Sequence, residues 1–137
     1  MSDCLFCKII DQKIPADIVY EDSNMLAFLD IYPNNPGHTL VVPKEHYEDL
    51  LSTPDAVLAK LISSVKMLGS KIMEAVKADG FNLGVNTKPA SGQVIFHTHF
   101  HIIPRFKDDG LKHWPQKQIT KEEMQKVKEA IKAKLSA

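Results

Sequence analysis

Apolar residues recur every three to four positions in two parts of the chain, which is the period of an amphipathic α-helix. The longer pattern runs from Pro54 to Val76 and predicts the main helix. The shorter one runs from Thr120 to Leu135 and predicts a C-terminal amphipathic helix. A short helix is also expected over residues 5–10. The two long stripes consist of Val57, Leu58, Leu61, Ile62, Val65, Leu68, Ile72 and Val76, then Met124, Val127, Ile131 and Leu135.

Extended runs rich in β-branched and aromatic residues lie between these helices and are separated by turn residues. The first two runs flank a four-residue turn, which predicts a hairpin, and Pro104 ends the last run. We therefore expect an α+β fold in which an antiparallel sheet of about five strands has its helices on one face. The predicted strands are residues 18–20, 25–29, 39–42, 81–86 and 94–103.

The composition is that of one ordinary globular domain. The chain has 137 residues, of which 44% are hydrophobic and 25% are charged. We expect residues 1–115 to form its body and residues 116–137 to be a helical extension of the same domain. Acidic and basic residues balance at 17 each, which argues against binding to nucleic acid or to an anionic membrane surface. Any phosphate site must therefore be local.

Two sequence features bear on location. The N-terminal residues Met1 to Cys4 lack the basic start and apolar stretch of a secretory signal. No run approaches the ~18 consecutive apolar residues that a membrane span needs. We therefore expect a soluble, cytoplasmic protein with no membrane partner.

Three of the six histidines occupy alternate positions, at His97, His99 and His101, in the last predicted strand. Side chains on a strand alternate between its faces, so the three imidazoles should share one face. Phe96, Phe100 and Ile102 should occupy the core face, where each buried side chain contributes roughly 1.5–3 kcal/mol. This burial would hold the histidines outward on a rigid strand.

Two simpler explanations of the three histidines are possible. An exposed polar face could use histidine by chance, but three neighbouring cations would repel one another below their usual pKa of ~6.5. All three could bind one metal ion, but strand positions two and four apart are separated by ~6.6 Å and ~13 Å, whereas Zn–N bonds are ~2.1 Å. At least one imidazole therefore remains free, and neutral imidazole is a competent nucleophile toward phosphorus.

The segment from His97 to Ile103, His-Thr-His-Phe-His-Ile-Ile, resembles the signature of the histidine triad (HIT) family. The resemblance continues through Phe28–Pro33, Gly37–His46 and Gly92–Gln93, and it spans Cys4 to about Pro115. The chain looks most like the nucleotide-binding phosphoramidases and the small bacterial members of this family.

This resemblance implies a covalent mechanism. His99 would attack the α-phosphorus of a nucleotide and form a nucleotidyl-histidine, from which water would release a nucleoside monophosphate. His101 would hydrogen-bond the phosphate or fix the tautomer of His99, and His38 would extend that network. Asn86 and Gln93 would bind phosphate oxygens, each contributing roughly 3 kcal/mol to catalysis by analogy with oxyanion holes.

The resemblance also implies a site for the nucleoside. Asp30 ends a strand before a turn, so from spacing alone it could simply cap that turn. In the family reading its two oxygens accept the hydrogens of the ribose 2′,3′-diol. A purine base would lie in an apolar slot, although the same residues could be ordinary core. The slot residues are Leu5, Phe6, Ile9 and Ile31.

Cys4 and Cys7 alone are compatible with a redox pair, two idle thiols or half of a zinc site. A thioredoxin-like arrangement has little support, because the pair does not follow a strand. Some bacterial HIT proteins complete a Cys₂His₂ site with the histidines that match His46 and His97. A closed site with four protein ligands would be structural.

Two further features limit how far the resemblance reaches. Val94 stands where phosphoramidases of this branch often have serine, which leaves phosphoramidates, dinucleoside polyphosphates and adenylated metabolites open as substrates. The segment His113–Pro115 resembles one used across a dimer interface, which implies a homodimer. Two non-enzymatic classes stay open as well: a nucleotide-binding module and a zinc-organised interaction protein.

Overall fold

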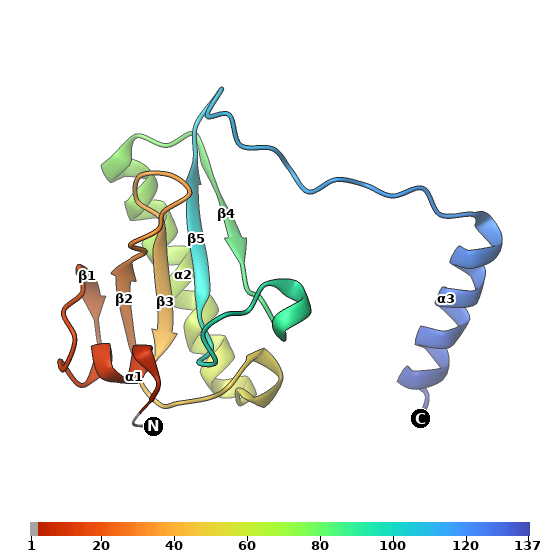
Figure 1. Cartoon of the computed structure of the whole chain (residues 1–137), viewed down its shortest axis with the longest axis horizontal. Coiled ribbons are helices and arrows are strands. Elements are labelled where there is room, and N and C mark those ends of the chain that lie inside the picture. The colour runs from red at the N-terminus through yellow and green to blue at the C-terminus, as the bar shows by residue number, and fades with distance from the viewer. Residues whose placement is uncertain (1–2) are drawn as a thin grey trace.

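The computed structural model, which describes residues 3–137, contains a five-stranded antiparallel sheet with the strand order β1-β2-β3-β5-β4. Its α+β architecture and its C-terminal helix confirm the predicted fold class (Figure 1). The elements are α1 (Leu5–Ile10), β1 (Ile18–Glu21), β2 (Met25–Leu29), β3 (Thr39–Pro43), η1 (Leu50–Ser52), α2 (Asp55–Val76), β4 (Gly80–Gly84), η2 (Pro89–Ser91), β5 (Phe100–Arg105) and α3 (Lys121–Leu135).

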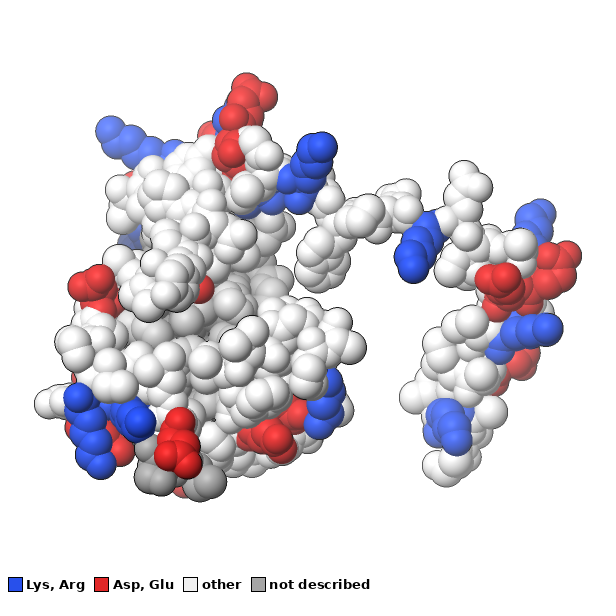
Figure 2. Space-filling model, in the orientation of Figure 1, with Lys and Arg blue, Asp and Glu red and all other residues white. Residues whose placement is uncertain are grey.

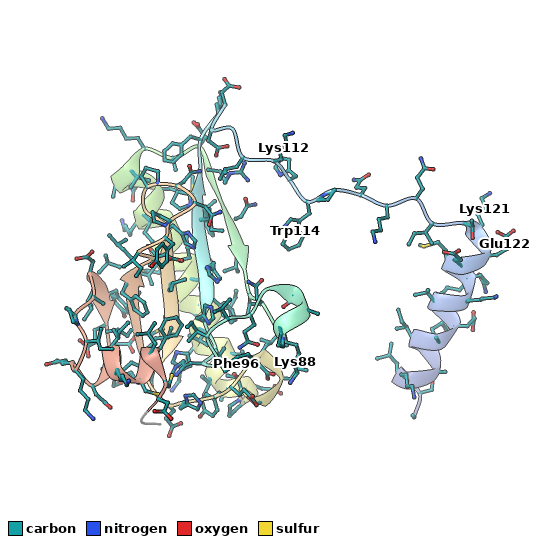
Figure 3. All side chains as sticks on the ribbon, viewed as in Figure 1. Lys88, Phe96, Lys112, Trp114, Lys121 and Glu122 are labelled. Atoms are coloured by element: carbon teal, nitrogen blue, oxygen red, sulfur yellow. The ribbon has the colours of Figure 1, made fainter. Side chains whose placement is uncertain are left out.

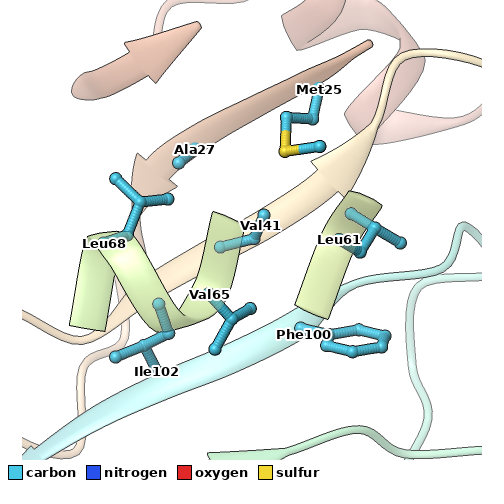
Figure 4. Packing of buried hydrophobic residues seen from close by; sticks show 8 residues of the cluster. All are labelled: Met25, Ala27, Val41, Leu61, Val65, Leu68, Phe100 and Ile102. Atoms are coloured by element: carbon cyan, nitrogen blue, oxygen red, sulfur yellow. The ribbon is translucent and has the colours of Figure 1, made fainter. Parts of the chain in front are cut away.

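The main core lies between α2 and the sheet. Leu61, Val65 and Leu68 come from the predicted helical stripe and pack against alternate residues of β2, β3 and β5 (Figure 4). Val41 and Ile102 in the sheet are fully buried there. The periodic pattern therefore identified the centre of the inner face of α2 correctly, but it also included Ile62, which is 48% exposed.

A second apolar cluster covers the opposite face of the sheet, so the prediction that the helices lie on one face is wrong for α1. Phe6 and Ile9 of the short helix α1 pack there against Leu26, Phe28 and other residues of β2 and β3. The strands β2 and β3 are consequently buried on both faces. Leu40 belongs to this second cluster and pairs with His101 across β3 and β5, so the histidine side of β5 faces α1.

The last strand begins at Phe100, six residues later than predicted. Phe100 and Ile102 face the α2 core as expected, but Phe96 is 44% exposed, so its predicted core position is wrong. The prediction that His97 is held outward is also wrong, because its side chain is fully buried. The cause is a change of hydrogen-bond partners: the Pro43 carbonyl accepts from the His97 ring, and the Thr98 amide donates to Tyr47 in a loop.

The helix α3 stands apart from the sheet at the end of an extended segment covering residues 111–120 (Figure 1). None of its residues is buried, and its apolar stripe, which includes Met124 and Ile131, faces solvent. Trp114 in the extended segment is 88% exposed (Figure 3).

Charged side chains lie mainly around the edge of the face shown in Figure 2, and the centre of that face is hollowed and carries little charge. Around this edge, lysines and arginines are interspersed with acidic residues. Within residues 3–137, no helix combines the length and apolar character needed to cross a membrane. The face shown in Figure 2 therefore carries no broad basic surface.

Candidate functional site

A chain of hydrogen bonds fixes the tautomers of two histidines. The backbone N–H of Asn34 donates to Nδ1 of His38 over 3.1 Å, so in neutral His38 the proton must be on Nε2. That Nε2–H donates to Nδ1 of His101 over 3.0 Å. The proton of His101 is therefore on its own Nε2, a buried atom with no hydrogen-bond partner. We call this arrangement the histidine relay: the Asn34 amide, His38 and His101.

His99 is set in the complementary tautomer by the backbone. Its Nδ1 lies 2.7 Å from the carbonyl oxygen of His97, which can only accept, so Nδ1 carries the proton. Its Nε2 is left with a free lone pair. The ring of Phe6 packs edge-on against that of His99 with centroids 5.0 Å apart, which restricts rotation of the imidazole.

The imidazoles of His99 and His101 are neighbours, with ring centroids 4.9 Å apart. Burial, together with the neighbouring His99, lowers the pKa of His101 to about 4. Burial also lowers the pKa of His99 and of His38. All three rings are therefore neutral at pH 7. His99 thus offers a lone pair on Nε2 and His101 an N–H on Nε2, and attack on a phosphate ester requires such a nucleophile and donor.

Asp30 serves the turn and also faces the relay. Its Oδ1 accepts the backbone N–H of Tyr32 over 2.8 Å, as expected for a turn-capping carboxylate. Its Oδ2 lies 3.5 Å from Nε2 of His38. The structure thus agrees with the turn interpretation and also places the carboxylate beside the histidines.

The donor atoms of Asp30, His38 and His101 lie close enough together to suggest a metal site. A metal at Nε2 of His38 would have to replace the proton there, while the Asn34 N–H still points at Nδ1 of the same ring. The ring would then be left as an imidazolate, which is costly at neutral pH. A hydrogen-bonded relay accounts for this cluster better than a bound metal does.

The predicted phosphate-binding residues lie in the loop before the histidines. Gly92 has φ +105°, and a side chain on it would touch the amide of Asn86, so Asn86 lies directly over the Gly92 backbone. Gln93 is buried, and its amide is already engaged: Nε2 donates to the carbonyls of Glu48 and Ile95, and Oε1 accepts from Lys88. The side chain of Gln93 thus braces the loop in this structure, and its predicted phosphate contact stays a prediction.

The four predicted slot residues differ in their surroundings. Phe6 lies beside both His97 and His99. Ile9 belongs to the second core cluster, which agrees with its alternative reading as core. Leu5 is partly exposed, and Ile31, at 74% exposed, has open space around it. Phe6 belongs to the same core cluster as Ile9 and is only 4% exposed, so of the four only Leu5 and Ile31 are exposed to solvent. A role in base binding stays a prediction for all four.

A second cluster consists of Cys4, Cys7, His46 and His97, which we call the Cys–His cluster. Their four ligand atoms lie within 4.8 Å of one another. The N–N distance is 3.2 Å and the three S–N contacts measure 3.4, 3.4 and 3.6 Å. A tetrahedral zinc site with Zn–S of ~2.3 Å and Zn–N of ~2.05 Å has edges of roughly 3.4 and 3.6 Å. The donors are thus arranged as such an ion needs.

The tautomer of His97 suits metal binding. Its Nε2 lies 2.8 Å from the Pro43 carbonyl, so the ring proton is there and the Nδ1 lone pair faces the cluster. Burial lowers the pKa of His97 to about 4, which keeps the ring neutral. Burial, assisted by Cys4, raises the pKa of the Cys7 thiol when no metal is present. Such an outer hydrogen bond to a carbonyl is the usual support for a zinc-binding histidine.

Several residues that shape the site carried no signal in the sequence. Asn34 acts through its backbone N–H, which any residue but proline supplies. The buried Asp49 pairs with Lys88 over 2.6 Å and so ties the loop that carries Gln93 to the N-terminus of η1. Lys88 has φ 75° and ψ 155°, a region that lysine rarely adopts. The Asn34 donor is a backbone group common to nearly all residues, and Asp49 and Lys88 are far apart in the chain, so local patterns could not reveal these contacts.

The family model described as the HIT domain matches residues 11–108 of this chain. The chain therefore belongs to the HIT family, as its histidine motif predicted. A HIT-like protein of Methanocaldococcus jannaschii is 50% identical over 107 residues, which are 78% of this chain and 82% of that protein. The adenylylsulfatase HINT3 of Arabidopsis thaliana is 44% identical over 129 residues, 94% of this chain and 64% of that protein.

Solved structures agree with this assignment. The crystal structure of SMU.412c from Streptococcus mutans superposes with a TM-score of 0.90 at 38% identity, covering 98% of this chain and 87% of that one. A zinc-bound histidine triad family protein from Mycobacterium smegmatis has a TM-score of 0.79 at 36% identity, covering 98% and 96%. The likeness to the first structure extends over nearly the whole chain, α3 included.

Proposed function

We propose that this protein is a nucleotide hydrolase or transferase that cleaves at the α-phosphorus through a nucleotidyl-histidine. One observation carries the proposal: the His97 carbonyl leaves Nε2 of His99 unprotonated, while the relay leaves a proton on Nε2 of the neighbouring His101. A nucleophile and a hydrogen-bond donor are therefore prepared side by side before any substrate binds.

In the first step, Nε2 of His99 attacks the α-phosphorus, a P–N bond forms and the bond to the leaving group breaks. The Nε2–H of His101 donates to a phosphate oxygen and stabilises the charge that develops there. The leaving group takes a proton from solvent, since Val94 supplies no hydroxyl where serine is common in the phosphoramidases. In the second step, water attacks the phosphorus, the P–N bond breaks, and nucleoside monophosphate and free His99 result.

Substrate binding in this proposal uses neutral groups. Asn86 and Gln93 contact phosphate oxygens, the latter after exchanging one of its loop hydrogen bonds. Asp30 accepts the ribose hydroxyls through Oδ2, and a purine base packs against Leu5, Phe6 and Ile31. Purine nucleoside phosphoramidates are the substrate class that we favour, and dinucleoside polyphosphates are the main alternative.

The proposal includes a structural zinc ion. Cys4, Cys7, His46 and His97 would hold it as a closed four-ligand site, which supplies folding energy and takes no part in the chemistry. The donor set, the S–N and N–N distances and the tautomer of His97 support it. Thiolate ligands are stable in a reducing compartment, which fits the cytoplasmic location expected from the sequence.

We also propose that the protein is a homodimer. A helix of 15 residues is marginally stable by itself in water, yet no residue of α3 is buried. An apolar surface of α2 and β4, including Ile62, Met73 and Leu83, is open to receive a second copy. Removing residues 116–137 should give a particle with the mass of one truncated chain in light scattering. A particle with the mass of two truncated chains would place the interface elsewhere.

The direct test is to incubate purified protein with adenosine phosphoramidate, adenylyl sulfate and a dinucleoside polyphosphate, and to follow nucleoside monophosphate. Turnover that disappears in His99→Ala supports the proposal, and the preferred leaving group identifies the substrate class. Nucleotide binding without turnover would indicate a binding module. Neither binding nor turnover, with stoichiometric zinc, would indicate a zinc-organised interaction protein.

A further inference from the structure

A buried carboxylate some distance from the histidines organises the end of β5. Asp109 accepts two hydrogen bonds from the Arg105 guanidinium, at 2.8 and 3.1 Å, and one each from the backbone N–H groups of Phe106 and Leu111. Its side chain is only 7% exposed. A carboxylate so fully hydrogen-bonded is held in one position, which makes it a rigid anchor for whatever else it contacts.

The remaining contact of Asp109 leads toward the site. The side-chain amide of Asn35 donates to Asp109 over 3.0 Å and to the Pro104 carbonyl over 2.9 Å. The backbone carbonyl of Asn35 in turn accepts the N–H of His38 over 3.1 Å. The loop between β2 and β3 is thereby fastened to the end of β5 through one side chain.

The same loop carries the amide that begins the histidine relay. Asn34, next to Asn35, donates its N–H to Nδ1 of His38 and so excludes a proton there, while the Asp30 carboxylate, 3.5 Å from Nε2, favours the same tautomer from the other side of the ring. Packing on the far side leaves the loop little room: Gly37 has φ +90°, and a side chain on it would come within 3.1 Å of both Pro104 and Val76. Contacts on two sides therefore fix where the Asn34 amide points.

We propose that Asn35 and Asp109 are positioning residues, which hold the Asn34 amide against His38 and thereby determine on which nitrogen of His101 the proton lies. If the amide moved away, the proton of His38 could lie on its Nδ1, and its Nε2 would then be an acceptor. The Nδ1 of His101 would have to become the donor of the hydrogen bond between the two rings. The proton on Nε2 of His101 would then be absent. Only the kinetic consequence rests on the proposed function, because the tautomers themselves are a property of the free protein.

The first test uses the intact wild-type protein labelled with ¹⁵N. Long-range ¹H–¹⁵N spectra of the imidazoles should show His38 and His101 protonated on Nε2, and a coupling across the hydrogen bond should join the Asn34 amide nitrogen to Nδ1 of His38. A His38 ring protonated on Nδ1, or a missing coupling with the amide in ordinary exchange with solvent, would overturn the inference without any variant.

The second test compares Asn35→Ala with Asn82→Ala. Asn82 accepts from the same Arg105 over 2.7 Å, but its side chain makes no hydrogen bond to the loop, so its loss controls for general weakening of this network. In Asn35→Ala we expect the His38 signals to shift toward a mixture of tautomers and kcat to fall about 10–100-fold, with KM within about two-fold, the range seen when supporting hydrogen bonds of a site are removed. Asn82→Ala should leave both unchanged.

The outcomes separate this inference from the proposed function. Equal losses in the two variants, or Asn35→Ala with wild-type tautomers and wild-type kcat, would overturn it. If the wild type turns over no nucleotide, the proposed function fails while the spectra still decide the inference. Should Asn35→Ala not fold, Asn35→Ser removes the amide with less loss of volume, and the wild-type spectra stand in any case.

Discussion

The Nδ1–H of His99 donates to the backbone carbonyl of His97 over 2.7 Å, so two residues of the same short segment fix the reactive nitrogen of the nucleophile. His97 is itself tied at its ring to the Pro43 carbonyl. The His97 ring and the His97 carbonyl are thus both hydrogen-bonded. The orientation of His99 therefore follows from a backbone group and needs no acidic side chain. The first prediction tests the nucleophile that results.

Replacing His99 with alanine should lower kcat by at least ~10³-fold, because a residue that forms the covalent bond has no substitute. Nucleotide affinity should change little, since the base, ribose and phosphate contacts remain. A slow substrate should trap the wild-type protein with one acid-labile nucleotidyl group on His99, measured by mass spectrometry. A label found on Cys4 or Cys7, or a variant that retains its turnover, would refute the mechanism.

Asp30→Ala should reduce kcat/KM for ribonucleotides by about 10-fold or more, while 2′,3′-dideoxynucleotides lose much less. The reason is that a carboxylate recognises only hydroxyls that are present, and removing one good hydrogen bond to a charged group costs ~1.5–3 kcal/mol. Matched substrate pairs should be measured with both proteins. Equal losses for the two sugars would assign Asp30 to the Tyr32 turn alone.

The pH dependence of stability should reveal His101. Its pKa is about 4 when folded and ~6.5 when unfolded, so the unfolded chain binds the proton more readily between these values. The contribution of His101 to folding is complete above pH 6.5 and is lost as the pH falls toward 4. Urea unfolding at several pH values should therefore show a shallower acid loss for His101→Gln than for the wild type. Identical slopes would contradict the buried, neutral state of this ring.

Zinc removal should act on stability before it acts on chemistry. We expect about one zinc per chain by elemental analysis, and a lower melting temperature after strong chelation or in Cys4→Ser, since a structural site contributes folding energy. Each ~1 kcal/mol lost lowers the melting temperature of a domain this size by roughly 3–5 °C. Immediate loss of turnover at unchanged stability would instead make the metal catalytic and weaken the covalent mechanism.

Gly69→Ala should destabilise the protein, although alanine favours helices. A side chain at Gly69 would come 2.5 Å from the ring of Phe81, and overpacking of this kind typically costs about 1–3 kcal/mol. Gly80→Ala is the matched control, because no atom lies within 4 Å of the added carbon. Chemical unfolding of both variants measures the difference, and a Gly69→Ala protein as stable as the wild type would show that Phe81 can move aside.

The sequence predicted those features of the fold that follow from local periodicity. The stripe of α2 and the alternation of Phe100 and Ile102 were readable because helices and strands impose fixed periods on burial. The same rule failed at Phe96, since the chain there bonds to a histidine ring and a loop instead of a neighbouring strand. The alternation rule cannot detect that change, because it assumes that pairing continues.

The sequence predicted that the histidines and cysteines would gather, but it did not predict where their protons lie. The histidine motif and the two cysteines identified which side chains to consider, and the fold brings them together. The tautomers depend on the Asn34 amide, the His97 carbonyl and the Pro43 carbonyl, which are backbone groups present in almost every residue. Only the folded structure shows where these backbone groups point.

The helix α1 has six residues, fewer than the ~12–15 that an isolated helix needs, so it persists only through what it touches. Those contacts are the packing of Phe6 and Ile9 and the approach of its two thiols to His46 and His97. Local opening of this short helix costs less than unfolding the sheet, and it would remove the Phe6 ring from the face of His99. Reagents that modify imidazoles should therefore react faster with His99 when the contacts of α1 are weakened.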